Sequence, residues 1–254
     1  MSVFGDYSRY YDLIYKGKDY EGEAAFIAKL LKEHVPKAES LLELGCGTGK
    51  HAMLLNDRGY HIDGVDLSAE MVELANERSK AEGKTAVFQG TEGDVRTVRT
   101  GKTYDAVISL FHVLSYQNSN ADVLAYLDTA ASHLESGGVF ICDYWYGPAV
   151  LHLRPEVRVQ EFENDEFKIR RLVQPELYPS KNLVDVNYTI IASHKQENRV
   201  NEVEETHTMR YIFEPELELF AQQAGFSVQK SAAWMSNAEP GLTTWGVYSV
   251  LIKK

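Results

Sequence analysis

Residues Leu41 to Lys50, Leu-Leu-Glu-Leu-Gly-Cys-Gly-Thr-Gly-Lys, constrain the fold more than any other stretch of this chain. Leucines on both sides of one acid are typical of a short buried strand. Three glycines at alternate positions follow, and residues 51–58 then have a helical pattern. This order is typical of a cofactor-binding turn, because glycine allows close backbone approach to a ligand and the helix N-terminus offers free N–H groups.

The spacing of the glycines separates three kinds of cofactor loop. The dinucleotide fingerprint G-x-G-x-x-G needs glycine where this chain has Lys50. The phosphate loop G-x-x-x-x-G-K-[ST] needs glycine in place of Leu44 and a hydroxyl in place of His51. The pattern E/D-x-G-x-G-x-G is matched in full by Glu43 and the three glycines. A purely structural turn remains the alternative for the glycines taken alone.

Composition excludes several classes of function. The chain has 254 residues, enough for one large α/β domain. Its net charge of −11 disfavours a nucleic-acid partner, because an acidic surface repels a phosphate backbone. We expect no signal peptide and no membrane segment, since the N-terminus lacks a basic and an apolar region and no apolar run approaches about 18 residues. Cys46 and Cys142 lie outside any C-x-x-C, so we expect reduced thiols and a cytoplasmic protein.

Acids follow two further predicted strands. Asp66 ends the strand at residues 61–66, about 20 residues after the first glycine, where an acid binds ribose hydroxyls in nucleotide-binding domains. An N-cap role is the alternative, but Ser68 is better placed for it. Asp94 and Val95 follow the third strand, where an acid can accept from an adenine amino group and a backbone N–H can reach a ring nitrogen. A plain turn aspartate is the alternative.

Side chains after the fourth strand, residues 104–110, are candidates for chemistry, because ligands bind at the carboxyl ends of such strands. His112 is our candidate general base, with a hydrogen-bonded structural histidine as the alternative. The histidines lack metal-ligand spacing, so we predict no metal. We expect aromatic side chains to wall the pocket or to pack in the core: Tyr116, Tyr144, Trp145, Trp234 and Trp245.

An aromatic stretch precedes the first strand, with tyrosines at positions 7, 10, 11, 15 and 20. It has two interpretations. It is either an arm packed on the domain or a lid whose tyrosine hydroxyls and a lysine face a bound ligand.

Strand and helix alternate five times up to Tyr146, which predicts a doubly wound, Rossmann-like α/β fold. We expect a mostly parallel seven-stranded sheet with an antiparallel terminal strand. From about residue 157 the alternation has period two without helices, which predicts an antiparallel β insertion. The predicted division is a cofactor-binding core with an N-terminal lid at 1–146, an insertion at 147–213 and a closing helix and strand pair at 214–254.

In their order, the glycine loop, Val65-Asp66, Gly93-Asp94-Val95 and the turn after Leu110 resemble the class I S-adenosylmethionine (SAM)-dependent methyltransferases. The resemblance covers residues 40–146. It implies SAM as cofactor and these cofactor-binding residues: Tyr11, Tyr20, Glu43, Gly45, Cys46, Gly47, Asp66, Leu67, Met71, Asp94, Val95 and Leu110.

A narrower resemblance concerns the opening Tyr11-Asp12-Leu13-Ile14-Tyr15, Lys18-Asp19-Tyr20 and the strand insertion. These are similar to bacterial N,N-dimethyltransferases of nucleotide-linked amino sugars. We therefore expect a small-molecule methyltransferase, with an amino sugar as preferred acceptor and a homodimer formed through the insertion. A small-molecule O-methyltransferase, a SAM-binding regulatory protein without catalysis and a nicotinamide oxidoreductase are the alternatives.

Overall fold

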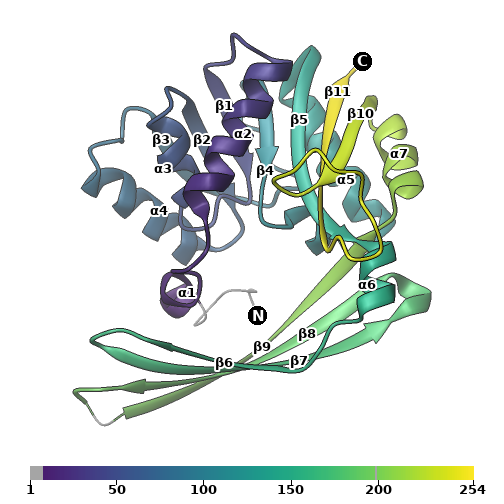
Figure 1. The fold of residues 1–254 in the computed structure, drawn as a ribbon. Coiled ribbons are helices and arrows are strands. Elements are labelled where there is room, and N and C mark those ends of the chain that lie inside the picture. The colour runs from purple at the N-terminus through teal and green to yellow at the C-terminus, as the bar shows by residue number, and fades with distance from the viewer. Residues whose placement is uncertain (1–7, 198) are drawn as a thin grey trace.

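The computed structural model of the chain describes residues 8–197 and 199–254 (Figure 1). Its centre is a parallel sheet in the order β3-β2-β1-β4-β5, to which β11 adds in antiparallel direction and β10 adds as the outer strand. The strands of this core sheet are Ser40–Leu44 (β1), His61–Asp66 (β2), Phe88–Glu92 (β3), Tyr104–Ser109 (β4), Leu134–Tyr146 (β5), Phe226–Ala233 (β10) and Gly246–Lys253 (β11).

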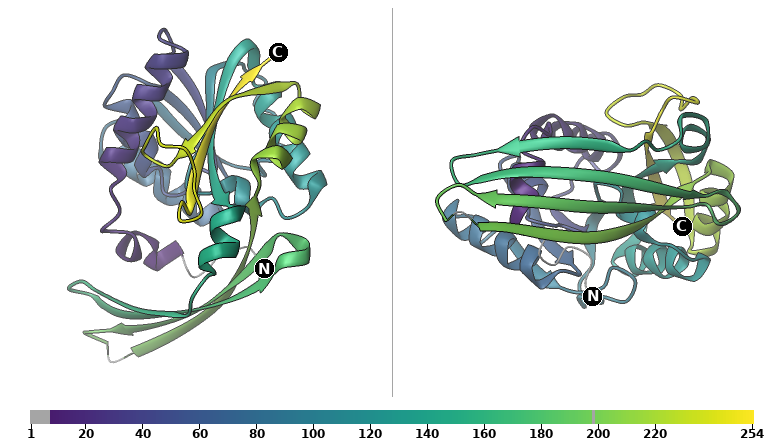
Figure 2. Two further views of the ribbon diagram at one scale, coloured as in Figure 1. Left: turned by 45° about the vertical axis from the view of Figure 1, so that its right-hand side comes forward. Right: turned by 90° about the horizontal axis from the view of Figure 1, so that it is seen from below.

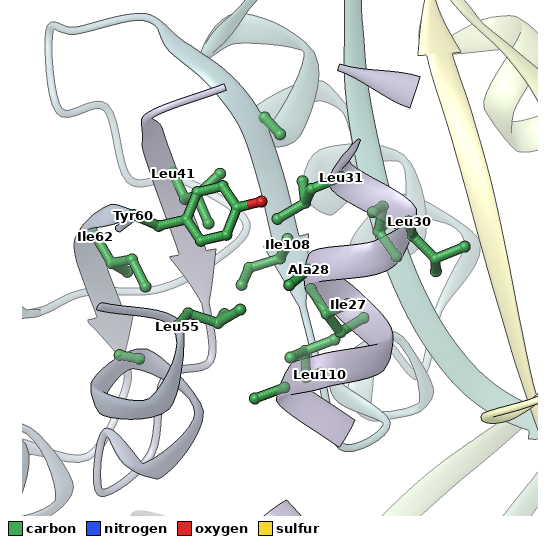
Figure 3. Close-up of a cluster of buried hydrophobic side chains, with 14 of the residues drawn as sticks. Ile27, Ala28, Leu30, Leu31, Leu41, Leu55, Tyr60, Ile62, Ile108 and Leu110 are labelled. Carbon is green, nitrogen blue, oxygen red and sulfur yellow. The ribbon is translucent and has the colours of Figure 1, made fainter. Parts of the chain in front are cut away.

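Helices cover both faces of the core sheet (Figure 1). One face packs against Tyr20–His34 (α2) and Lys50–Asn56 (α3), and the other against Asn120–Ser132 (α5) and Glu214–Gln223 (α7). Ala69–Ala81 (α4) packs beside β3. Figure 3 shows Ile27 and Leu31 of α2 meeting Ile108 of the sheet. Each fully buried aliphatic side chain of this kind contributes roughly 1.5–3 kcal/mol, so these contacts fix the helices that flank the cofactor loop.

The second half of the chain builds a long antiparallel sheet beneath the core (Figures 1 and 2). It follows the short helix Gly147–Leu153 (α6) and consists of Arg158–Glu163 (β6), Phe167–Tyr178 (β7), Leu183–His194 (β8) and Arg199–Ile212 (β9), with the turn Pro179–Lys181 (η2) between β7 and β8. We call these four strands the lower sheet. Seen from below, they cross the underside of the core side by side (Figure 2, right).

A short ladder joins the two sheets. Trp145 pairs with Tyr211 and Tyr146 with Ile212 in parallel register, so the end of β5 and the end of β9 form one continuous backbone ladder. The fixed join sets the distance between the core and the lower sheet. The helix Ser8–Ile14 (α1) lies between the two layers (Figure 1). Its side chains Tyr10, Tyr11 and Ile14 are buried against Phe167, Ile169 and Ile190.

The predicted fold class is confirmed, with one correction to the strand count. The expected seven strands are those of the core sheet, but the join to β9 extends the hydrogen-bonded path to eleven. β3 begins at Phe88, because Val87 and Phe88 donate their N–H groups to the carbonyl of Lys84 in a turn that precedes the strand. The division of the chain at residues 146 and 213 stays a proposal about folding units.

Candidate active site

A cavity of about 550 Å³ lies where the carboxyl ends of the core strands face the lower sheet. This is the edge at which ligands bind in open α/β sheets. The core side of the cavity is formed by the glycine loop, the segments after β2, β3 and β4, and α1. The lower-sheet side is formed by Tyr188 of β8 and residues 206–209 of β9. The sequence signal for these last residues is only the period-two alternation, which does not reveal which strand faces the site.

The glycine loop has a conformation that side chains rarely adopt. Gly45, Gly47 and Gly49 all have positive φ, at 81°, 53° and 73°. A Cβ atom at Gly45 would lie 2.4 Å from a methyl group of Val113, so this position excludes any side chain. Gly47 and Cys46 line the cavity. Because of these constraints, the loop backbone itself forms part of the cavity wall.

Asp66 connects the loop to the end of β2. Its carboxylate accepts from the N–H of Gly47 at 2.8 Å and from the N–H of Ser68 at 3.0 Å. Burial raises the pKa of Asp66, while these backbone N–H groups favour its charged form. The side chain lines the cavity, so it holds the loop and faces a ligand at the same time.

The other predicted cofactor residues differ in whether they line the cavity. Tyr11, Tyr20, Leu67, Met71, Val95 and Leu110 all line the cavity. Asp94 lines it too, but its carboxylate already pairs with Arg96, whose hydrogen bonds lower the pKa of Asp94. Glu43 does not line the cavity. It is buried behind the loop, and burial, with the charge of Asp66 nearby, raises the pKa of Glu43 to about 8.

His112 follows β4 and lines the cavity. Phe111 and His112 both have φ of 67°, an uncommon left-handed conformation for residues other than glycine. The backbone N–H of His112 donates to Oδ1 of Asp143 at 3.0 Å, and its Nδ1 lies 2.8 Å from Oδ2. Asp143 is buried at the end of β5. The carboxylate thus holds the backbone of His112 through its N–H group and lies beside the imidazole.

A second polar cluster lies beside α1. Glu23 of α2 pairs with Lys18 and with His51, whose Nε2 lies 2.7 Å from the carboxylate. Burial opposes ionisation of Glu23, but the hydrogen bonds of His51 and Lys18 keep its pKa at about 2. Lys18 also lies over the rings of Tyr20 and Phe111. Sequence reasoning missed Glu23 and His51, because they stand in helices with ordinary core spacing.

Asp12 attaches α1 to the cofactor loop. Its carboxylate accepts from the hydroxyl of Thr48 at 3.1 Å and pairs with Lys50 and Arg78. Tyr15, also in this segment, lines the cavity together with Tyr11 and Tyr20. Tyr10 instead packs edge-on against Phe167 of the lower sheet. Tyr7 lies outside the described residues. The remaining tyrosines therefore include both of the types expected, cavity-facing and packed.

The aromatic candidates also divide. Tyr116, Trp145 and Trp245 line the cavity, and the two indole rings lie 5.3 Å apart. Tyr144 is fully buried, with its hydroxyl 3.2 Å from Ser249, so of the two expected positions it has the one in the core. Trp234 packs against Phe26 and Tyr248 outside the cavity wall. In a strand, neighbouring side chains point to opposite faces, which is why Tyr144 and Trp145 differ.

Comparison with known proteins shows which sequences this chain resembles. Residues 41–138 match the methyltransferase domain family. The chain is 36% identical over 146 residues to dTDP-3-amino-3,6-dideoxy-alpha-D-glucopyranose N,N-dimethyltransferase of Streptomyces fradiae, a match that spans 57% of this chain and 55% of that protein. It is 35% identical over 145 residues to dTDP-3-amino-3,4,6-trideoxy-alpha-D-glucopyranose N,N-dimethyltransferase of Streptomyces venezuelae, spanning 56% of this chain and 59% of that protein. The matched stretch is thus little more than half the length of these relatives.

The lower sheet lies outside the matched family domain, and a solved structure extends the likeness to it. An S-adenosylmethionine-dependent methyltransferase from Clostridium acetobutylicum superposes with a TM-score of 0.81 at 20% identity, covering 98% of each chain. These findings confirm the methyltransferase domain predicted from the glycine loop. Residues 41–138 match the methyltransferase domain family, and the chain as a whole shares its fold with that S-adenosylmethionine-dependent methyltransferase.

Proposed function

We propose that this protein transfers a methyl group from SAM to the amino group of a nucleotide-linked sugar. One observation carries the proposal: a single cavity joins a glycine loop of the methyltransferase type to a carboxylate-backed histidine and an aromatic wall. The cofactor half lies on the core, and the acceptor half lies against the lower sheet. Such a division holds two reactants side by side in one cavity, which is the main requirement for an in-line transfer.

The residues of the core half fit SAM. The loop excludes a side chain at Gly45, and Asp66, to which we assign the ribose hydroxyls, lines the cavity at the end of β2. Met71 and Leu110 offer an apolar surface for a purine, with Val95 beside Asp94 at the far end. When bound, SAM supplies an electrophilic methyl group on a sulfonium. Titration calorimetry of the wild-type protein with SAM tests this assignment, and absence of binding would reject it.

His112 supplies the acid–base chemistry in this proposal. An amine attacks only in its neutral form, so a base that removes a proton matters most below the pKa of the amine itself. Asp143 lies beside the imidazole, with its Oδ2 2.8 Å from Nδ1. His112→Ala should therefore lower the turnover rate by about 10²–10⁴-fold, and the loss should shrink as pH rises. A loss that stays constant across pH would leave His112 a positioning role.

The acceptor class is supported by the two dimethyltransferases described above, which are named for dTDP-linked amino sugars. The rings of Trp145, Trp245 and Tyr116 suit a sugar face or a flat base. A screen of amino-sugar nucleotides beside hydroxyl acceptors tests the class. If only a hydroxyl acceptor is turned over, the proposed reaction is O-methylation in place of amino-sugar N-methylation, and the methyltransferase assignment is unchanged.

We further propose that the protein acts as a homodimer on small molecules, in the cytoplasm and without a nucleic-acid partner. The net charge of −11 supports the last point, and the two free, buried cysteines support a reducing compartment. No described helix has the length and apolar character to span a bilayer. The outer strand β6 supports the dimer, because it leaves one edge without a hydrogen-bonded neighbour among the described strands and exposes Val157 and Val159 beside it.

A further inference from the structure

Two buried side chains, Glu23 and His51, lie beside the glycine loop and have no role in the proposed reaction. His51 stands in the first turn of α3, directly after the loop, and lines the cavity although only 7% of the residue is exposed. Its Nε2 lies 2.7 Å from Oε2 of Glu23. The ring of Tyr20 packs against the imidazole with 5.0 Å between centroids. These two contacts set the orientation of the imidazole.

Glu23 acts as an acceptor for three donors. Besides His51, its carboxylate binds Nζ of Lys18 and, at 3.3 Å, Nε1 of Trp234. Its pKa of about 2 means that Glu23 stays ionised at neutral pH. Because a carboxylate only accepts hydrogen bonds, Nε2 of His51 carries the proton in the bond between these two residues.

The other ring nitrogen of His51, Nδ1, is then an acceptor. Burial lowers the pKa of His51, although the bond to Glu23 opposes this shift, so the imidazole is neutral at pH 7. A neutral imidazole has one N–H, which Glu23 already binds, so Nδ1 has a lone pair. Within the described part of the chain Nδ1 makes no hydrogen bond, and it is not among the unpaired polar atoms there that are sealed from solvent. Nδ1 is therefore open to a ligand in the cavity.

The order of the core strands indicates which part of SAM would reach this nitrogen. In the order β3-β2-β1-β4, Asp94 follows β3, Asp66 follows β2 and His112 follows β4. A cofactor with its adenine at Asp94 and its ribose at Asp66 has its sulfur near the end of β1, where the methyl group can face His112. Its amino-acid end then lies beside the glycine loop and the first turn of α3. Lys50 and His51 line the cavity there, so a zwitterion meets both a cation and a lone pair.

We propose that Nδ1 of His51 accepts a hydrogen bond from the α-ammonium group of SAM, and that Glu23 is the positioning residue that keeps the ring proton on Nε2. The inference deepens the proposed function and rests on it, because it assumes that SAM is the cofactor. The lone pair of Nδ1 suits the ammonium and repels the carboxylate at the same end of SAM. His51 thus distinguishes SAM and its product from analogues that lack the amine.

Three ligands separate the groups of the amino-acid end by titration calorimetry, without any turnover. S-Adenosylhomocysteine has both groups, 5′-(3-carboxypropyl)thioadenosine lacks only the amine, and 5′-(3-aminopropyl)thioadenosine lacks only the carboxylate. The wild-type protein should bind S-adenosylhomocysteine at least about 10-fold more tightly than the carboxypropyl analogue, the factor expected for one hydrogen bond from a charged donor.

Two substitutions of His51 separate ligand recognition from support of the fold. His51→Gln has an amide N–H near the position of Nε2, so it keeps the bond to Glu23 and removes the acceptor Nδ1. It should reduce the preference for the amine by about 10-fold with little change in Tm. His51→Asn has the opposite effect, because its amide oxygen lies near the position of Nδ1 while the bond to Glu23 is lost. It should lower Tm and retain most of the preference.

The outcomes that overturn the proposal can be told apart. If the wild-type protein binds S-adenosylhomocysteine and the carboxypropyl analogue equally, or if His51→Gln weakens both by the same factor, the assignment of His51 is wrong and SAM stays the proposed cofactor. If the preference falls in step with Tm in the two variants, His51 only supports the fold.

A third result would reverse the role of the ring. If His51→Gln reduces the preference for S-adenosylhomocysteine over the aminopropyl analogue instead, Nδ1 is a donor to the carboxylate and the proposed contact is wrong. If the wild-type protein binds none of the three ligands, the proposed function fails together with the inference.

Discussion

Asp66 shows how one side chain can serve the fold and the site together. Its two oxygens receive the N–H groups of Gly47 and Ser68, which ties the glycine loop to the segment that opens α4. A ribose on the same carboxylate would therefore bind to a group whose position is already fixed. Preorganisation of this kind lowers the entropic cost of binding.

Asp66→Ala should weaken SAM binding by about 1–3 kcal/mol, because it leaves buried N–H groups unpaired and removes the ribose partner. Asp66→Asn is the matched control, since its amide oxygen still accepts one of the two backbone bonds and the loss should be smaller. Calorimetry on both variants measures the difference. An alanine variant with wild-type affinity would contradict the ribose role.

Glu43 predicts a pH dependence of stability. Its pKa is raised from 4.5 to about 8 in the folded protein, so the native state holds a proton that the unfolded state releases. The contribution is present in full below the unfolded pKa and is lost as pH rises toward 8. Within this window each pH unit costs up to about 1.4 kcal/mol.

Glu43→Gln imitates the protonated acid and should flatten the fall of Tm between pH 5 and 8, with the larger gain at pH 8. Thermal unfolding in buffers from pH 5 to 8 measures how Tm depends on pH. Equal slopes for the variant and the wild type would show that Glu43 does not carry this dependence.

Some single residues of the site could be predicted from the sequence and others could not. Asp66, the glycines and His112 could be assigned to the site because each follows a strand at a recognisable spacing. The left-handed backbone at Phe111 and His112 could not be predicted, since nothing in these residue types signals it. The sequence also could not show that Trp145 faces the cavity and Tyr144 the core, because the register of β5 with β11 and β9 determines this.

At the scale of elements, helix α1 is the part that connects the two layers. Asp12 attaches it to the glycine loop and to α4, while Tyr10 and Ile14 pack on the lower sheet. Removal of residues 1–20 would expose Ile169 and Ile190, so we expect a truncated protein to lose stability as well as cofactor affinity. A point substitution is the sharper experiment.

Asp12→Asn should speed the dissociation of SAM several-fold with little change in Tm, because the ion pairs it weakens are half-exposed and contribute little to stability. Stopped-flow fluorescence and thermal unfolding measure the two quantities. Asp57→Asn, which weakens a pair with Lys84 away from the cavity, is the control. Equal dissociation rates in the Asp12 variant and the wild type would leave α1 only a packing role.

The elements differ in how far local sequence determines them. The lower sheet has apolar periodicity of period two, which predicts antiparallel strands but not their exact ends. Helices α1 and α6 have 7 residues each and too few turns for a periodic signal. The position of the lower sheet depends on the two-residue ladder between β5 and β9, a contact between distant segments that no local pattern contains.

At the scale of the whole molecule, the free edge of β6 leads to a prediction about assembly. Val159 is 61% exposed on this outer strand, and a second copy paired along it would cover it. Val159→Lys should convert the proposed dimer to monomer in sedimentation velocity. Leu219→Lys, a similar change at a residue of α7 that is 64% exposed, should leave the dimer intact. A wild-type monomer at all concentrations would refute the assembly.

The join between the two sheets also bears on how such a protein diversifies. Apart from Leu110, the proposed cofactor residues that line the cavity lie before residue 100, and part of the acceptor half comes from residues 188–209. Drift in the later segment alters the acceptor wall without touching Gly45, Asp66 or the strands that support them. The residues proposed for the cofactor and those proposed for the acceptor thus lie largely on separate stretches of sequence. New acceptor preferences can then arise while the cofactor half of the cavity is kept.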